Sequence, residues 1–107
     1  MNYDWKLKKM SQFQLEITEQ GYLILPQTIA TEYFAEDVCV AIWREPELWI
    51  LPIHSSNAGG FLLKQRNAHG DRSVLIHEVL PNNWKSGTYP TFWDAENGSM
   101  RMALKNA

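Results

Sequence analysis

The sequence predicts a mainly β domain, a small barrel or sandwich of hairpins with one short α-helix. Short runs of alternating or continuous apolar residues recur along the chain between turn residues, which is typical of strands. Only one segment, near residues 27–34, spaces its apolar side chains as a helix does. The 107 residues are 45% hydrophobic and 21% charged, a balance typical of one globular domain.

The first half, residues 1–54, is expected to form a β-β-α-β-β unit. Four strands are predicted by apolar patterning, at residues 13–18, 22–25, 38–43 and 48–51. The helix is expected after Pro26, because proline suits the first turn of a helix. Its apolar stripe consists of Ile29, Ala30, Tyr33 and Phe34. Turns are predicted at Gly21 and at Arg44-Glu45-Pro46-Glu47.

The second half, residues 61–107, is expected to form a four-strand meander after a connecting loop at 55–60. Its strands are predicted at residues 61–66, 73–79, 91–94 and 100–104. Asn97-Gly98 is a strong hairpin signal between the last two strands. Because so short a chain has no room for two independent cores, both halves are expected to share one domain, residues 1–107. The hairpin edges need cover, which predicts a homodimer.

The sequence also predicts a cytoplasmic protein that does not cross a membrane. No apolar run reaches the roughly 18 residues of a membrane helix. Residues 1–9 lack the apolar stretch of a signal peptide. The single cysteine, Cys39, cannot form an internal disulfide, and its place between Val38 and Val40 is typical of an inert core thiol.

A resemblance to a known family lies in residues 21–34, GYLILPQTIATEYF. This stretch is similar to the G-x-[IL]-x-[IL]-P-x-x-[IL] motif of the AbrB- and MraZ-type swapped-hairpin family, and the resemblance covers residues 13–53. It implies two chains that interlock into a small barrel and bind DNA or, in antitoxins, also a protein partner. Where the family typically carries two arginines, this chain has Tyr22 and Ala30. The alternative is a different small β fold that shares the short pattern.

The charge distribution disfavours DNA binding. Residues 11–48 contain seven acidic residues and one basic one. Nucleic-acid affinity depends on clustered Lys and Arg, which this segment lacks.

No catalytic residue, metal site or cofactor is predicted. The histidines at 54, 69 and 77 are not paired at the spacing of zinc ligands. No phosphate-binding glycine loop and no nucleophile elbow occur. The sequence therefore favours a protein that is not an enzyme.

Two candidate binding sites emerge. The first is the polar hairpin tip formed by Lys64, Arg66, His69, Asp71 and Arg72. Its two arginines flank the loop at 67–71 and predict a site for a phosphate or carboxylate, the alternative being an ordinary solvated turn. The second is an aromatic interaction surface at Trp43, Trp49 and Trp84, the alternative being that these rings fill the core.

These observations predict a non-catalytic protein-interaction module, an accessory or regulatory protein with a protein partner. The first alternative is a DNA-binding transcriptional regulator of the swapped-hairpin type. The second alternative is a binder of a small anionic ligand, or a small enzyme, acting at the hairpin tip.

Overall fold

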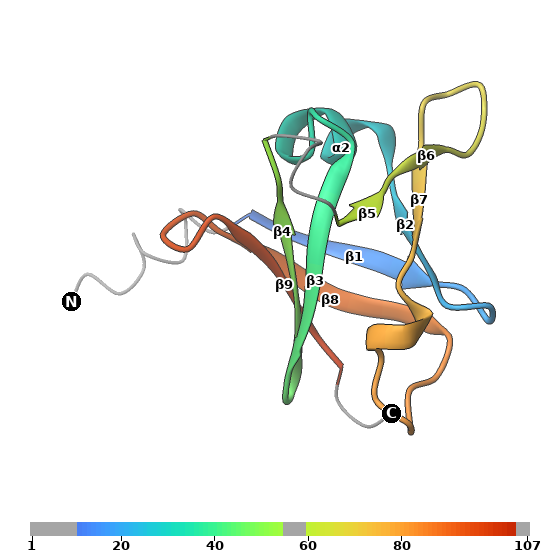
Figure 1. The fold of residues 1–107 in the computed structure, drawn as a ribbon, viewed down its shortest axis with the longest axis vertical. Helices are drawn as coiled ribbons and strands as arrows, with labels where there is room; N and C mark the ends of the chain where they lie inside the picture. Colours follow the sequence, from blue (N-terminus) through green and yellow to red (C-terminus); the bar gives the residue numbers. More distant parts are fainter. Residues whose placement is uncertain (1–10, 55–59, 105–107) are drawn as a thin grey trace.

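One antiparallel sheet of nine strands makes up most of the computed structural model, which describes residues 11–54 and 60–104. The sheet curls back toward itself, as Figure 1 shows, and its nine strands confirm the mainly β prediction. Its strands are β1 (Ser11–Ile17), β2 (Tyr22–Leu25), β3 (Val38–Arg44), β4 (Glu47–Pro52), β5 (Phe61–Leu62), β6 (Lys64–Gln65), β7 (Arg72–Leu75), β8 (Gly87–Asp94) and β9 (Ser99–Ala103).

The two ends of the sheet are joined by the chain itself. The strand order is β5-β3-β4-β9-β8-β1-β2-β7-β6, so β5 and β6 lie at opposite ends of the sheet. Only Leu63 separates these two strands in the sequence, and its side chain is buried. The sheet is therefore a nearly closed barrel.

The first half has the predicted β-β-α-β-β order. Its helix, α2 (Gln27–Tyr33), begins after Pro26 and buries Ile29 and Ala30 against the sheet. Gly21 forms the β1–β2 turn with φ +90°, a backbone conformation that favours glycine. A Cβ atom at this position would lie 2.6 Å from the His77 Cβ, so the close approach also requires glycine.

The predicted four-strand meander in the second half is wrong. β7 pairs with β2 and β6, whereas β8 pairs with β1 and β9, so the hairpins β6–β7 and β8–β9 lie apart in the sheet. β9 also pairs with β4 from the first half. Long-range pairing sets this order, which the local alternation of residues does not encode.

Two predicted strands of the second half also differ in extent. The strand expected at 61–66 is divided at Leu63, where the chain leaves β3 and joins β7. The strand expected at 73–79 ends at Leu75, and His77–Val79 form a short 3-10 helix, η2. Most of the connecting loop expected at 55–60 lies outside the described residues.

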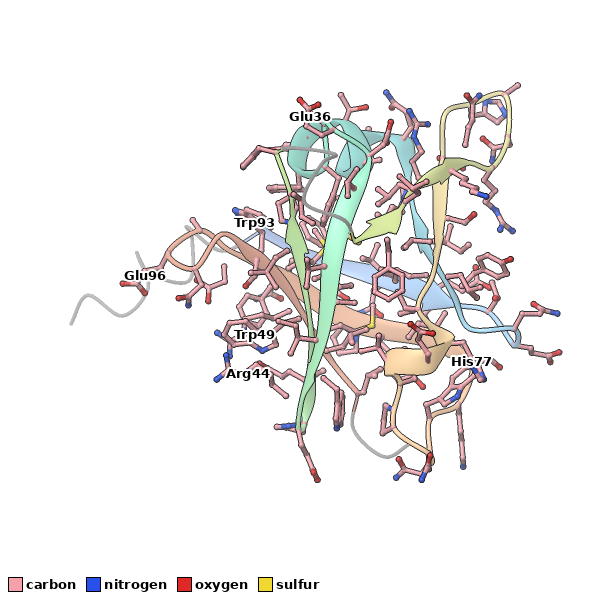
Figure 2. All side chains as sticks on the ribbon, viewed as in Figure 1. Glu36, Arg44, Trp49, His77, Trp93 and Glu96 are labelled. Carbon is pink, nitrogen blue, oxygen red and sulfur yellow. The ribbon has the colours of Figure 1, made fainter. Side chains whose placement is uncertain are left out.

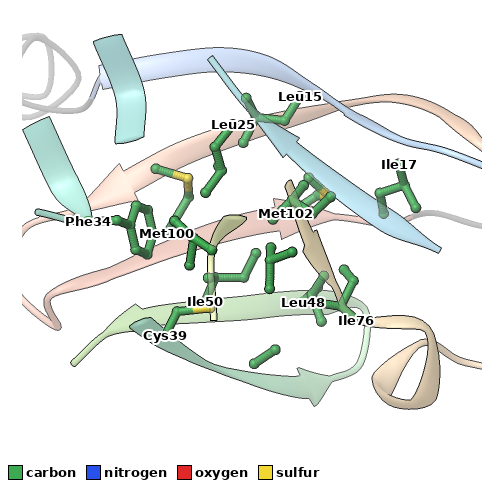
Figure 3. Packing of buried hydrophobic residues seen from close by; sticks show 14 of the residues in the cluster. Leu15, Ile17, Leu25, Phe34, Cys39, Leu48, Ile50, Ile76, Met100 and Met102 are labelled. Atoms are coloured by element: carbon green, nitrogen blue, oxygen red, sulfur yellow. The ribbon is translucent and has the colours of Figure 1, made fainter. Parts of the chain in front are cut away.

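The core fills the space between the inner faces of the sheet and α2, as Figure 3 shows. Its fully buried side chains include Leu48, Ile50, Met100 and Met102. Cys39 is buried among them, which confirms its prediction as a core residue, and burial raises the pKa of its thiol to about 12. Within the described residues, α2 and η2 are too short to span a bilayer.

Candidate functional site

The outer face of the barrel carries a row of side chains that crosses four strands. In the pairing register, Ile42 on β3 lies opposite Trp49 on β4, Trp49 opposite Arg101 on β9, and Arg101 opposite Phe92 on β8. Residues directly opposite in a sheet share a face, so these four side chains project outward together. Their immediate neighbours along the strands, such as Leu48 and Met100, project into the core.

Two arginines stack on the ring of Trp49. The guanidinium carbon of Arg101 lies 4.7 Å from the centroid of the Trp49 ring and 5.0 Å from that of Phe92. The guanidinium carbon of Arg44, on β3, lies 4.6 Å from the Trp49 centroid. Cation–π contacts of this kind are favourable because the ring face carries negative charge density.

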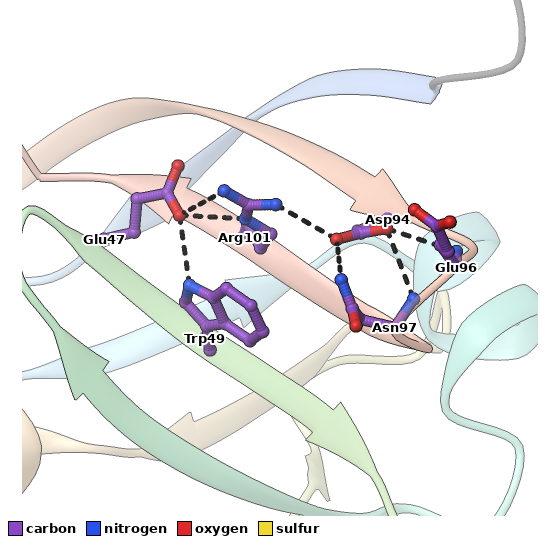
Figure 4. Close-up of polar contacts among 6 residues, drawn as sticks. All are labelled: Glu47, Trp49, Asp94, Glu96, Asn97 and Arg101. Atoms are coloured by element: carbon purple, nitrogen blue, oxygen red, sulfur yellow. Dashed lines mark hydrogen bonds and ion pairs between the residues drawn. The ribbon is translucent and has the colours of Figure 1, made fainter. Parts of the chain in front are cut away.

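Two carboxylates hold Arg101 in this position, as Figure 4 shows. Glu47 Oε1 accepts hydrogen bonds from Arg101 Nε at 2.8 Å and from Trp49 Nε1 at 3.0 Å. Asp94 Oδ2 accepts one from Arg101 Nη1 at 3.0 Å. We refer to Arg44, Glu47, Trp49, Phe92, Asp94 and Arg101 as the Trp49 face.

The turn between β8 and β9 in turn positions Asp94. Asp94 Oδ1 accepts hydrogen bonds from the backbone N–H groups of Glu96 and Asn97, at 3.1 and 3.3 Å. Gly98, the predicted hairpin glycine, adopts φ +60° in this turn. The hairpin thus presents its carboxylate to Arg101 through an ordered local network.

The charges of the Trp49 face stabilise one another. Hydrogen bonding to Glu47 is the largest cause that raises the pKa of Arg101, with partial burial opposing it and Asp94 adding to it. Partial burial acts to raise the pKa of Asp94, but hydrogen bonds from Asn97 and Arg101 outweigh it, and the pKa lies below its ordinary value. The lowered pKa of Asp94 and the raised pKa of Arg101 both favour the charged ion pair between these two residues.

The three tryptophans predicted as an interaction surface do not lie on one surface. Trp43 lies opposite the buried Leu48 in the register, so it faces the core while Trp49 faces outward. Trp84 packs against the core and makes an edge contact with His77, with ring centroids 6.0 Å apart. Figure 2 places Trp49 and His77 on different sides of the molecule. Only Trp49 belongs to the outer face.

The predicted hairpin tip uses Asp71 to hold the start of α2. Asp71 Oδ1 accepts a hydrogen bond from the backbone N–H of Gln27 at 2.8 Å, and Oδ2 accepts one from Asn67 Nδ2 at 2.9 Å. The hydrogen bond from Asn67 is the largest cause that lowers the pKa of Asp71, followed by the one from Gln27. Asp71 thus caps the first turn of a helix that lies 44 residues away in sequence.

The two arginines of the tip are not brought together as an anion site. Arg72 Nε donates to Asp37 Oδ1 at 3.0 Å, and its Nη1 donates to the backbone carbonyl of Gly70 at 2.6 Å. Arg72 lies opposite Gln65, whereas the Arg66 backbone bonds to that of Asp71, so the two arginine side chains alternate to opposite faces of the hairpin.

The remaining tip residues, Lys64, Arg66 and His69, are exposed. Among the residues that the structure describes, no group of three or more His, Cys, Asp or Glu side chains is arranged to hold a metal ion. Through Asp71 and Arg72, the tip docks the β6–β7 hairpin onto the start of α2 and onto Asp37, which precedes β3.

Sequence reasoning missed Arg101, Phe92 and Asp94. The alternation of residues 100–104 places Arg101 on the outward side of a strand, which was an available signal. Its partner Glu47 lies 54 residues earlier, and no local pattern links the two.

No protein-family model, curated protein or solved structure matches this chain. The resemblance of residues 13–53 to the swapped-hairpin family therefore stays a prediction.

Proposed function

We propose that this protein is a non-catalytic protein-interaction module, with an accessory or regulatory role, whose partner binds the Trp49 face. The observation that carries the proposal is the stack of Arg44, Trp49, Arg101 and Phe92 on the outside of the sheet. In the part of the chain that the structure describes, neither Trp49 nor Phe92 is among the side chains that pack against the hydrophobic core. Their large rings are thus held at the surface.

The chemistry of this face suits protein recognition. Tryptophan and arginine, with tyrosine, are enriched among the residues that dominate binding energy at protein interfaces. Glu47 and Asp94 fix the Arg101 side chain before any partner arrives, so less conformational entropy is lost on binding. A preorganised face of this kind favours affinity.

Arg44 provides the Trp49 face with guanidinium N–H groups that a partner can reach. The Arg44 side chain is exposed. Among the ion pairs of the described residues, 11–54 and 60–104, none involves Arg44. A guanidinium stacked on a ring retains its outward N–H groups for a carboxylate or carbonyl of a partner.

The two alternative functions are less well supported. DNA binding and anion binding both need free cations, whereas Arg101 and Arg72 are each paired with carboxylates. The proposal of a protein partner needs no such free cluster.

Affinity capture from cells that produce the protein tests the proposal. The baits are the wild type, Trp49→Ala and Arg44→Gln, with Arg66→Gln as the matched control on another part of the surface. We expect proteins captured by the wild type and by Arg66→Gln to be lost with Trp49→Ala and reduced with Arg44→Gln. Equal capture by Trp49→Ala and the wild type, at equal folded protein, would overturn the proposal.

A further inference from the structure

An open groove lies where the barrel fails to close. It forms between β5 and the β7–η2 segment and has a volume of about 440 Å³. Its apolar lining comes from Phe61, Leu62 and Leu75. We refer to these residues, with Lys64, His77 and Glu78, as the seam groove.

The seam groove and the neighbouring Tyr22 account for most of the exposed large apolar side chains of the described residues. Leu62 is 60% exposed and Leu75 is 48% exposed. Tyr22, 38% exposed, lies directly opposite Leu75 in the β2–β7 register. Only Ile42, on β3, lies elsewhere among the exposed large apolar residues that the structure describes. A contiguous apolar cluster of this kind marks an interaction site more often than a scattered residue does.

The backbone along this groove is an incompletely covered strand edge. Pairing between β6 and β7 ends at Lys64 and Ser73, before it reaches Leu75. On the β2 side of β7, the Ile76 N–H donates a hydrogen bond to the Gly21 carbonyl. On the β6 side, the Asp71 carbonyl accepts one from the Arg66 N–H. Since backbone groups alternate sides along a strand, those of Leu75 point into the seam. Uncovered edges of this kind favour association with another chain.

The charges that border the groove are arranged at opposite ends. Lys64 lies beside β7 at the level of Ser73, and Glu78 lies beyond Leu75 in η2. Figure 1 shows β6 beside the upper part of β7, and the short turn of η2 below that strand. Neither Lys64 nor Glu78 belongs to an ion pair within the described ranges.

We infer that the seam groove is the interface of a homodimer, in which a second copy of this chain covers Leu62 and Leu75. A twofold axis through the middle of the groove reverses its direction in the partner. Lys64 of each copy then meets Glu78 of the other, and the apolar residues meet at the centre. The surface is thus self-complementary in both charge and apolarity.

The seam groove and the Trp49 face are different surfaces of the molecule. Figure 2 places His77, next to Glu78, away from Arg44 and Trp49. A dimer through the seam groove therefore leaves both copies of the Trp49 face available to a partner.

Sedimentation velocity of the full chain, from low-micromolar to near-millimolar concentration, tests the inference. The proteins are the wild type, Lys64→Glu, Glu78→Lys, the double variant, and an equimolar mixture of the two single variants. Glu96→Lys, on the β8–β9 turn, is the matched charge control. Circular dichroism and the thermal midpoint establish that each variant is folded.

We expect the wild type and Glu96→Lys to form a species of twice the 12.4 kDa chain mass. Each single variant should dimerise at least about tenfold more weakly, because the symmetric interface contains the like-charge contact twice. The double variant and the mixture restore opposite charges and should dimerise as the wild type does. A monomeric wild type, or single variants that dimerise as tightly as the wild type, would overturn the inference, as would a double variant or mixture that stays monomeric.

Discussion

Replacing Arg101 with methionine removes a guanidinium that holds the Trp49 face together while keeping an apolar stem of similar length. The change deletes ion pairs with Glu47 and Asp94, which are partly exposed and contribute about 0.5–1 kcal/mol each. It also deletes cation–π contacts with Trp49 and Phe92, about 0.5 kcal/mol each at the surface. We therefore expect the free energy of unfolding to fall by about 2 kcal/mol and the thermal midpoint by roughly 8 °C.

Urea denaturation measures this loss, with Arg44→Met as the matched control. Arg44 stacks on Trp49 but forms none of the ion pairs found in residues 11–54 and 60–104. Its replacement should cost only about 0.5 kcal/mol, with an unchanged dependence on urea. Equal losses for the two variants would refute the reasoning, because the carboxylate network would then contribute nothing.

Asp94, Asp71 and Cys39 each have a contact or a degree of burial that a single measurement can test. The pKa of Asp94 lies below its ordinary value of 3.8, so as pH falls the unfolded chain binds a proton at this carboxylate before the folded protein does. The stability that the carboxylate contributes is present above about pH 4 and is lost as the pH falls further. Asp94→Asn should therefore flatten the loss of stability in acid unfolding followed by fluorescence. Asp71→Ala should speed amide hydrogen exchange at Gln27 while β1 amides stay unchanged; an unchanged Gln27 rate would exclude the cap. Cys39, buried with a pKa of about 12, should react with Ellman's reagent at pH 8 far more slowly in the native protein than in urea, and equal rates would contradict its burial.

The local sequence determined the strands and the helix of the first half and the last hairpin of the second half. Alternation set which residues of β1 face inward, Pro26 set where α2 begins, and Asn97-Gly98 set the last hairpin. These features depend on residues within a few positions of one another. The same local patterns also placed Cys39 correctly in the core.

The order of the strands in the sheet was decided only by tertiary packing. Apolar patterning predicts which face of a strand is buried, but it does not predict which other strand pairs with that strand in the sheet. That is why the expected meander was wrong.

The candidate sites depend on the same distinction. The sequence by itself determined a mainly β chain with a surplus of aromatic rings and no recognisable catalytic motif. Only the tertiary structure brought Arg101 to Glu47, and Asp71 to Gln27, across 54 and 44 residues. The physical reason is that such contacts form when apolar faces pack together, so their partners are fixed by the geometry of the nearly closed sheet and not by their neighbours along the chain.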